Sequence, residues 1–465
     1  MRVRTLAATA TVAALAATGL TLPLAGSASA ATTLSDDYNG DGYRDLAIGN
    51  PKTNSVTVTL GSANGIAAAR HITLTQETSE VPGKTEPEDA FGDSLTSGDV
   101  NHDGFADLIV GAPGERVEGR PTGSVTILWG NESGFASGGL VLNAPADTEG
   151  RFGEGVAFGD MDFDGSPNLA VISGDNWWYY AEGVPDPDRP FGLEVDFLPK
   201  GVRLTGMDAG KFQSKDIVSY VLYGERADGG AYTAHLPAGA GDYGYYAKVL
   251  AEGDDPTATR DTAAHADLDG DGFDDLITGN SRAGKGGSVT VRMGGHGNEL
   301  GAPVTYDQSS TGVPGTDEPG DRFGAAVTAG DVTGDGHPDI AVGAPGENVG
   351  GVAGTGSVVL LKGTANGRPG AGTSWHQETA GVPGVAEPED HFGSSLRLKD
   401  INKNGRADLA IAANGEDIGT TSDVGAVWVL RGTTTGLTSS YATSFNGSDF
   451  RVGGGANADF GHTLR

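Results

Sequence analysis

Six nine-residue stretches of the chain place oxygen-bearing side chains at one repeated spacing. Each fits the pattern D-x-[DNT]-x-[DN]-G-x-x-[DN], and the fourth reads DLDGDGFDD. A glycine at position 6 permits a tight turn, so the side chains at positions 1, 3, 5 and 9 can converge with the main-chain carbonyl of position 7. Such a set of oxygens suits Ca²⁺, which takes about six to eight oxygen ligands and tolerates irregular geometry.

The predicted calcium ligands are the residues at positions 1, 3, 5, 7 and 9 of the six stretches. They are Asp37, Asn39, Asp41, Tyr43 and Asp45; Asp99, Asn101, Asp103, Phe105 and Asp107; Asp160, Asp162, Asp164, Ser166 and Asn168; Asp267, Asp269, Asp271, Phe273 and Asp275; Asp331, Thr333, Asp335, His337 and Asp339; and Asp400, Asn402, Asn404, Arg406 and Asp408. Solvated β-turns are the alternative, because Asp, Asn and Gly are common turn residues. The shared register of all six copies favours about six structural calcium sites. We expect the stretch at Asp267, with four carboxylates, to bind best, and the one at Asp400 to bind least tightly.

The composition narrows the class of protein. The 465 residues carry a formal net charge of −32, no Cys and 37% hydrophobic residues. That hydrophobic fraction is enough for a packed core. The acidic balance disfavours nucleic acid and anionic membranes as partners, because both attract positive surfaces. The lack of Cys excludes a disulfide framework and thiol catalysis.

The first 30 residues have the features of a signal peptide. Arg2 and Arg4 precede a stretch rich in Ala, Leu and Val, and Ala28-Ser29-Ala30 matches a small-residue cleavage site. A transmembrane anchor is the alternative, but the stretch is only weakly hydrophobic. We therefore expect export, with residues 31–465 released outside the cell as a monomer without a membrane span.

The acidic stretches are parts of a longer repeat of about 60 residues. The gap of 107 residues between Asp160 and Asp267 spans two such steps, and DAGKFQSKDIVSYVLYG, which starts at Asp208, fits there as a decayed copy. Gly210 and Phe212 replace ligands in that copy, so we expect it to bind no metal. Seven repeats are therefore predicted.

Each full repeat contains four strand-like segments. In the second repeat these are 91–100, 107–113 and 123–130, followed by a weaker segment before the next repeat. Gly, Pro and Asn mark the junctions. Four short strands cannot bury their faces alone, whereas seven such sheets arranged radially pack on one another and leave few free edges. The pattern predicts an all-β fold over residues 31–465, a seven-bladed β-propeller with four-stranded blades.

Two further motifs flank the acidic stretches. Phe91-Gly92 precedes the second stretch and Gly111-Ala112-Pro113 follows it, and the same pair of motifs recurs at Phe323 and Gly343. The chain thus resembles the FG-GAP repeat proteins, which include the N-terminal propeller of integrin α-chains and secreted bacterial relatives. This resemblance implies a propeller with calcium sites between strands and a role in binding. The first repeat lacks its FG pair, which occurs instead at Phe460-Gly461. We therefore predict that the C-terminal strand completes the first blade and closes the ring.

In the resembling family, a second set of loops lies on the face opposite the calcium loops. Here these are VPGKTEPEDAFG (81–92), VPGTDEPGDRFG (313–324) and VPGVAEPEDHFG (382–393), with GAPGE at Gly111 and Gly343. Their acids are Glu86, Glu88, Asp89, Glu115, Asp317, Glu318, Asp321, Glu347, Glu387, Glu389 and Asp390. They form either an acidic binding face for an extracellular protein or polysaccharide, or simply soluble turns.

Two aromatic stretches also have two interpretations. NWWYY (176–180) and DYGYYAKVL (242–250) are either core strands or docking sites for a sugar or protein. As core strands, they would turn alternate rings toward the two neighbouring blades.

No catalytic motif stands out. The chain has no G-x-S-x-G and no H-E-x-x-H, so we favour a binding or adhesion module at or outside the cell envelope. The alternative is a propeller-type hydrolase or lyase for extracellular polysaccharide or ester substrates, since paired carboxylates can hydrolyse glycosidic bonds. A deep axial pocket with a His or Tyr beside carboxylates would favour the enzyme.

Overall fold

The structure is a computed structural model that describes residues 34–136, 138–145, 148, 150–161, 165–180, 184–186, 198, 200–237, 247–297, 299–452 and 455–465. The chain divides into two units, Met1–Thr32 and Thr33–Arg465. The predicted signal peptide, residues 1–30, lies outside the described residues. Among the residues that are described, no helix is both long and apolar enough to span a membrane.

Residues 33–465 form antiparallel sheets joined by short connections. The first three sheets and one outlying hairpin contain β29 (Thr463–Leu464), β1 (Leu46–Asn50), β2 (Ser55–Thr59) and β3 (His71–Leu74); β4 (Leu95–Gly98), β5 (Asp107–Ala112), β8 (Ser124–Leu128) and β9 (Gly139–Asn143); β10 (Phe152–Gly159), β11 (Asn168–Ser173) and β12 (Asn176–Tyr180); and β6 (Arg116–Val117) with β7 (Arg120–Pro121). The described part of the third sheet therefore has three strands, and each of the other six has four.

The other four sheets follow the same order from the inner to the outer strand. They contain β13 (Val202–Gly210), β14 (Ser219–Arg226), β15 (Ala231–Leu236) and β16 (Lys248–Gly253); β17 (Thr262–Ala266), β18 (Asp275–Asn280), β19 (Ser288–Arg292) and β20 (Val304–Tyr306); β21 (Ala326–Gly330), β22 (Asp339–Ala344), β23 (Ser357–Leu361) and β24 (Gly372–Trp375); and β25 (Phe392–Lys399), β26 (Asp408–Ala413), β27 (Ala426–Thr433) and β28 (Gly436–Asn446). Two 3-10 turns, η1 (Pro51–Thr53) and η2 (Gly447–Phe450), complete the described elements.

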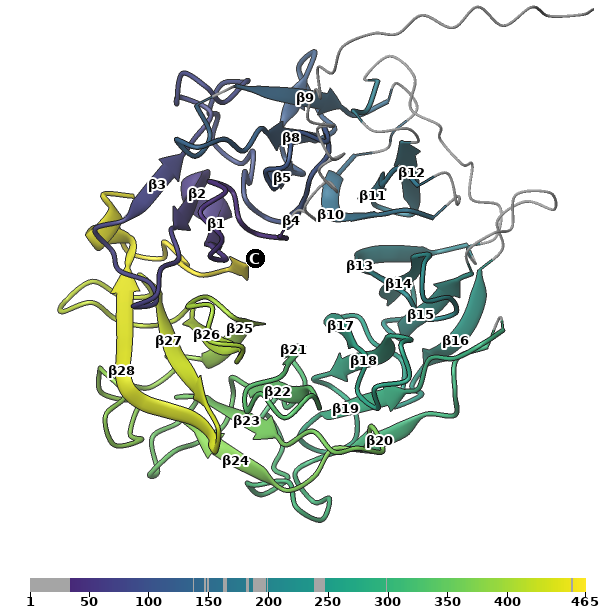
Figure 1. The fold of residues 1–465 in the computed structure, drawn as a ribbon, viewed down its shortest axis with the longest axis vertical. Coiled ribbons are helices and arrows are strands. Elements are labelled where there is room, and N and C mark those ends of the chain that lie inside the picture. The colour runs from purple at the N-terminus through teal and green to yellow at the C-terminus, as the bar shows by residue number, and fades with distance from the viewer. Residues whose placement is uncertain are drawn as a thin grey trace, which may run out of the picture. The chain divides into compact units, whose positions relative to one another are not determined.

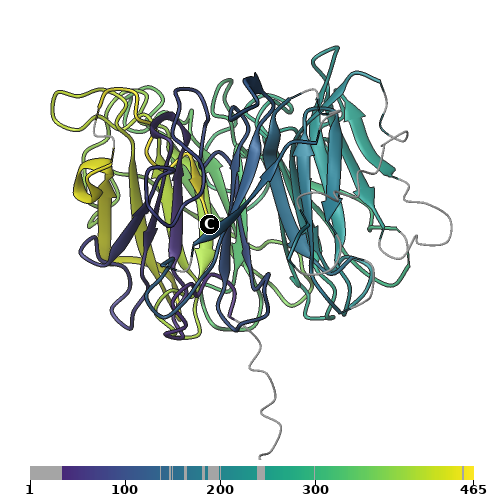
Figure 2. The ribbon, with the colours of Figure 1, turned by 90° about the horizontal axis from the view of Figure 1, so that it is seen from above.

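The seven sheets stand around a common axis as the blades of a β-propeller (Figure 1). Viewed from the side, the strands run between the two faces of the ring (Figure 2). The second strands β5 and β22 are buried at every residue, because neighbouring blades cover both faces of each strand. This explains why DLIVGA and DIAVGA are continuous apolar runs rather than alternating ones. The predicted seven-bladed fold is confirmed.

The two ends of the ring meet in the first blade. Strand β29 pairs with β1 through Ile48↔Leu464 and Gly49↔Thr463, and the main-chain N–H of Gly461 donates to Oδ1 of Asn50 at 3.0 Å. Phe460 is buried. The C-terminal strand therefore completes the first blade as the misplaced FG pair predicted.

The FG and GAP motifs interlock between blades. A Cβ atom added to Gly111 of the GAP motif would lie 2.0 Å from the carbonyl oxygen of Gly153, and one added to Gly343 would lie 2.1 Å from that of Gly393. At these two interfaces the glycine of the FG pair thus places its carbonyl oxygen against the GAP glycine of the preceding blade. The phenylalanine beside it fills the space between the blades; Phe392, for example, lies with its ring centroid 5.2 Å from that of Trp428.

The stretch NWWYY is a core strand. In β12, Trp177 and Tyr179 pack into a cluster shared with the fourth blade, whereas Trp178 and Tyr180 pack into one shared with the second. Trp177, Tyr179 and Tyr180 are almost fully buried. Alternate rings therefore meet opposite neighbours, as the core interpretation predicted. Most of the second stretch, residues 242–246, lies outside the described residues.

Candidate metal-binding loops

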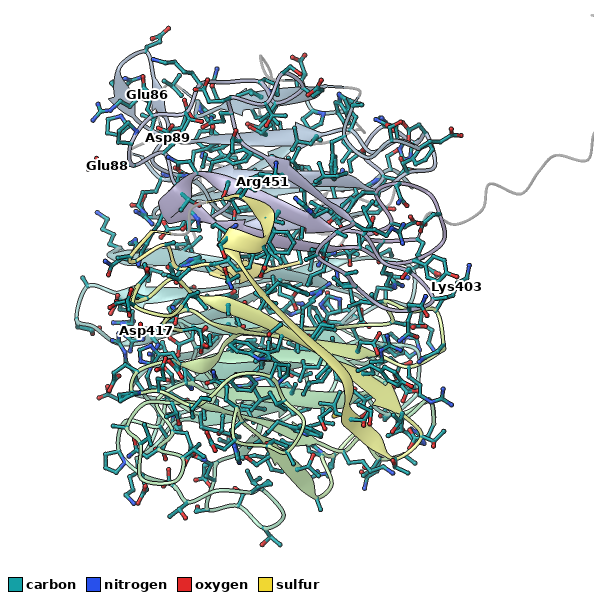
Figure 3. The ribbon with its side chains drawn as sticks, turned by 90° about the vertical axis from the view of Figure 1, so that its left-hand side faces the viewer. Glu86, Glu88, Asp89, Lys403, Asp417 and Arg451 are labelled. Atoms are coloured by element: carbon teal, nitrogen blue, oxygen red, sulfur yellow. The ribbon has the colours of Figure 1, made fainter. Side chains whose placement is uncertain are left out.

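Five of the six predicted calcium stretches join the first and second strands of their blades, and the stretch at Asp37 leads into β1, whose inner neighbour is β29. Figure 3 shows the two faces of the ring at opposite edges. Lys403, in the loop Asp400–Asp408, lies at one edge, and Glu86, Glu88, Asp89 and Asp417 lie along the other. The loop Asp400–Asp408 therefore lies on the face opposite these acidic residues, as predicted.

The carboxylate at position 1 holds the turn together in all six loops. One of its oxygens accepts a hydrogen bond from the main-chain N–H of the glycine at position 6. The pairs are Asp37–Gly42 (2.8 Å), Asp99–Gly104 (3.0 Å), Asp160–Gly165 (3.1 Å), Asp267–Gly272 (2.9 Å), Asp331–Gly336 (2.7 Å) and Asp400–Gly405 (2.8 Å). Gly272 has a φ of +90°, a conformation that favours glycine.

The carboxylate at position 9 fastens the loop to the sheet. In the fifth blade, the two oxygens of Asp275 accept hydrogen bonds from the main-chain N–H groups of Leu268 and Gly294, both at 2.8 Å. Asp45, Asp107 and Asp339 each accept two such bonds in the same way. In these four loops the two bonds explain why a carboxylate can lie at a buried position.

Burial of the position-9 acids raises their pKa. The pKa rises to about 7 for Asp45, Asp107 and Asp275 and to about 6 for Asp408, because burial penalises the charged form more than the main-chain hydrogen bonds favour it. The pKa of Asp339 is raised for the same reason. A cation beside these carboxylates would favour the ionised form instead.

The oxygens converge most clearly in the loop at Asp267. One carboxylate oxygen from each of Asp267, Asp269 and Asp275 lies within 4.8 Å of the others, which fits the spacing of ligands around one Ca²⁺ ion. At position 5, Asp271 accepts a hydrogen bond from the main-chain N–H of Phe273 at 2.9 Å. Tyr43, Phe105, His337 and Arg406 donate to position 5 in the same way. Their main-chain N–H groups are thus engaged within the loop. This set of oxygen ligands fits calcium. The loop at Asp267 is also the one that the sequence analysis predicted to bind calcium best.

Two loops depart from this geometry. In the seventh blade, the amide nitrogen of Asn402 donates to both oxygens of Asp408, at 3.1 and 2.8 Å, so nitrogen rather than oxygen faces the position-9 acid. In the third blade, Asn168 accepts from the N–H of Met161 at 2.9 Å, but its own amide nitrogen is buried without a partner among the described residues. The predicted ligands Asp162 and Asp164 lie outside the described residues.

The decayed copy in the fourth blade braces the neighbouring loop. The ammonium group of Lys215 lies 5.0 Å from the ring centroid of Phe273 and donates to the main-chain oxygen of Asp271. The N–H of Lys211 donates to Asp274 at 2.7 Å, while Asp208 pairs with Nδ1 of His265 at 2.8 Å. These contacts place positive charge next to the loop at Asp267.

The acidic loops of the opposite face offer fewer free carboxylates than the sequence suggested. Asp89, Asp321 and Asp390 are at most 1% exposed, because each folds back to accept a main-chain N–H of its own turn. Glu115 and Glu347 are half-buried and pair with Gln side chains. These five cannot contribute freely to a binding face. Exposed or half-buried acids remain at Glu86, Glu88, Asp317, Glu318, Glu387 and Glu389.

The inner strands enclose an axial cavity of about 660 Å³, to which each of the seven blades contributes. Asp208, Tyr223, His265, Arg397 and Arg465 are among its lining residues. Burial lowers the pKa of His265, but the charge and hydrogen bond of Asp208 outweigh this effect and raise it overall. Sequence reasoning missed these axial residues, although Arg397 interrupts an otherwise uncharged position in the repeats.

The repeats were then compared with known families. The model of the FG-GAP repeat matches residues 29–60, 91–128, 260–291, 323–361 and 392–430. The chain therefore contains five FG-GAP repeats. These five matches fall on the first, second, fifth, sixth and seventh blades.

Relatives of this FG-GAP protein match it over short segments. It is 41% identical over 93 residues to phosphatidylinositol-glycan-specific phospholipase D of Bos taurus. The matched segment covers 18% of this chain and 11% of the relative. It is 35% identical over 136 residues to integrin alpha-4 of Xenopus laevis. That matched segment covers 29% of this chain and 12% of the relative. The chain thus spans about a tenth of the length of these relatives.

One solved structure matches nearly the whole chain. A lectin of Agrocybe aegerita, described as recognising non-reducing terminal N-acetylglucosamine, superposes with a TM-score of 0.55 at 15% identity. The match covers 92% of this chain and 95% of that one. At this identity the likeness concerns the fold alone.

Proposed function

We propose that this FG-GAP protein is a secreted, calcium-binding, integrin-like propeller that acts as a binding or adhesion module at or outside the cell envelope. The observation that carries the proposal is the shared loop geometry, with three carboxylates converging in the loop at Asp267. The family match and the integrin relative support it. The features of a signal peptide in residues 1–30 support export.

Calcium in this proposal stabilises the propeller. Five of the six loops join the inner and second strands of their blades, and the loop at Asp37 leads into β1. An ion in each loop would fix that turn and neutralise clustered carboxylates. Calorimetric titration of the EDTA-treated chain with CaCl₂ tests this directly. We expect about six binding events and a rise in melting temperature; no heat and no rise would refute the calcium assignment. MgCl₂ at the same concentration is the control and should stabilise less, because Mg²⁺ demands stricter octahedral geometry.

The proposed partner is an extracellular protein or polysaccharide. The remaining exposed acids, such as Glu88 and Glu389, support a cationic or hydroxyl-rich ligand on the face opposite the calcium loops. A glycan and protein array, probed with and without calcium, would identify it. A triple variant with Glu88, Glu318 and Glu387 changed to Gln should lose the array signal while keeping the calcium-dependent melting temperature. An unchanged signal would exclude this face.

A hydrolase or lyase is the second candidate function. The observation that favours it is the axial cavity, where His265 pairs with Asp208 and Tyr223 lies in the same wall. Assays with extracellular polysaccharides and with ester and phosphodiester substrates test it, with His265→Asn as the variant. Turnover that His265→Asn abolishes would establish the enzyme; equal background rates for both chains would exclude this dyad.

A further inference from the structure

Three cations surround one buried carboxylate, that of Asp36, beside the axial cavity. Asp36 is 1% exposed. Arg465 Nε lies 3.0 Å, Lys399 Nζ 3.1 Å and Arg397 Nη2 3.9 Å from it. Burial lowers the pKa of Lys399 to about 7, and Asp261 adds a carboxylate to the cavity wall, whereas Arg397 and Arg465 line the cavity with guanidinium groups that stay charged at neutral pH. Asp208, also in the cavity wall, is already paired with His265.

The repeats show that this cluster is a local addition. Arg397 stands three residues before its loop, where the corresponding residues are Thr96, Ala157, Ala264 and Thr328. A strand of the same shape therefore forms with a small, uncharged residue at this position. The fold alone does not require a guanidinium there.

Arg397 is also poorly satisfied by its own protein. Its nearest carboxylate is the one at 3.9 Å, and its Nε is buried without a hydrogen-bond partner among the described residues. About 30% of its side chain remains exposed, and it lines the cavity. Burial and then the nearby Arg465 lower its pKa to about 10. Leaving a buried N–H donor such as this Nε without an acceptor costs stability, and a bound anion would offset that cost.

The rest of the cavity wall is rich in hydroxyl groups. Ser35, Ser97, Thr328 and Ser395 line it, and its volume lies in the range of small-molecule sites. A single inorganic anion would leave most of that space unfilled. A ligand with both a carboxylate and several hydroxyl groups would match the guanidinium fork and the hydroxyls together.

We propose that the axial cavity binds a small, hydroxyl-bearing organic acid of the size of a sugar acid, with its carboxylate on Arg397. This site goes beyond the proposed function and does not depend on calcium in the loops. The ligand's carboxylate would accept hydrogen bonds from the Arg397 guanidinium, and Thr328 and Ser395 would meet its hydroxyl groups.

Calorimetric titration of the calcium-loaded chain at constant ionic strength tests the proposal. The probes are sodium glucuronate, sodium galacturonate, glucose and sodium phosphate. At least one sugar acid should bind tenfold or more tightly than glucose and than phosphate. No binding of either sugar acid overturns the proposal. Phosphate that binds as tightly as the sugar acid overturns the assignment of the ligand class.

Three variants separate a binding role of Arg397 from a structural one. Arg397→Gln should weaken sugar-acid binding at least tenfold, while its melting temperature without ligand stays equal to or above that of the natural chain. Arg397→Lys keeps the positive charge but lacks the forked guanidinium, so its affinity for the sugar acid should lie between those of the natural chain and Arg397→Gln. Arg120→Gln, which removes an exposed arginine of the β6–β7 hairpin, is the matched control and should bind normally. Unchanged binding in Arg397→Gln, or a large fall in its melting temperature, contradicts the role.

Discussion

The substitution Asp275→Asn tests how the position-9 acids work. Both oxygens of Asp275 accept main-chain hydrogen bonds at 2.8 Å, from Leu268 and Gly294. An Asn has one acceptor oxygen, so its NH₂ group must face one of these N–H donors. Losing a charged hydrogen bond costs about 1.5–3 kcal/mol and leaving a donor buried and unpaired about 1–3 kcal/mol. We therefore expect the free energy of unfolding to fall by about 3–5 kcal/mol in EDTA.

Differential scanning calorimetry at pH 8 measures this loss. At that pH Asp275, with a pKa of about 7, is mostly ionised. An unfolding entropy of about 2.1 cal/mol/K per residue converts the loss to roughly 3–6 °C for a chain of this length. The control is Asp269→Asn, because its single hydrogen bond from Asp271 N–H, at 3.1 Å, can be kept by the Asn oxygen.

The two variants should differ in their response to calcium. Asp269→Asn should melt within about 1 °C of the natural chain in EDTA, but gain less from added calcium. A melting temperature for Asp275→Asn equal to that of the natural chain in EDTA would refute the hydrogen-bond reasoning. A full calcium response in Asp269→Asn would refute its assignment as a ligand.

Three further predictions follow from the fold and its loops. Calcium should raise the melting temperature more at pH 8 than at pH 5. Burial raises the pKa of Asp45, Asp107 and Asp275 to about 7. The metal-free folded state therefore binds more protons than the unfolded state and loses stability as pH rises through that value. Equal calcium-induced shifts in melting temperature at both pH values would contradict this. Phe392→Ala should lower the free energy of unfolding, measured in urea, by about 3–5 kcal/mol, because the ring is fully buried against Trp428. A decrease below about 1 kcal/mol would show that the blades repack. Gly111→Ala should abolish soluble expression, because its Cβ would lie 2.0 Å from a backbone oxygen of the next blade, whereas Gly455→Ala has open space and should express normally.

The sequence predicted the fold because the repeat fixes so many contacts at once. The FG and GAP glycines contact each other across every interface where both occur, as Gly111 and Gly153 do. The distance between these motifs along the sequence therefore indicates where one blade ends and the next begins. The position-9 acid joins two strands by accepting main-chain hydrogen bonds, which explains why it keeps the same position relative to the strands in each repeat that has it. Even the missing FG pair at the start of the chain pointed to Phe460 and to the closure by β29.

The exposure of the acidic loops could not be predicted in this way. The string EPED suggests a row of surface acids, yet Asp89 is buried because it accepts the main-chain N–H of Glu86 within its own turn. The axial charges were missed for a different reason. Asp36 and Lys399 lie 3.1 Å apart but belong to the first and last blades, so their proximity depends on the closure of the ring rather than on any local pattern.

The pairing of β29 with β1 has a consequence for how the protein is made. Translation produces β1 long before its inner neighbour, Thr463–Leu464. During synthesis the inner edge of the first blade therefore stays unpaired while the six later blades are completed one after another. A nascent chain must protect that edge until Thr463 and Leu464 emerge. A stop codon just before Thr463 would thus damage the first blade to be synthesised rather than the seventh.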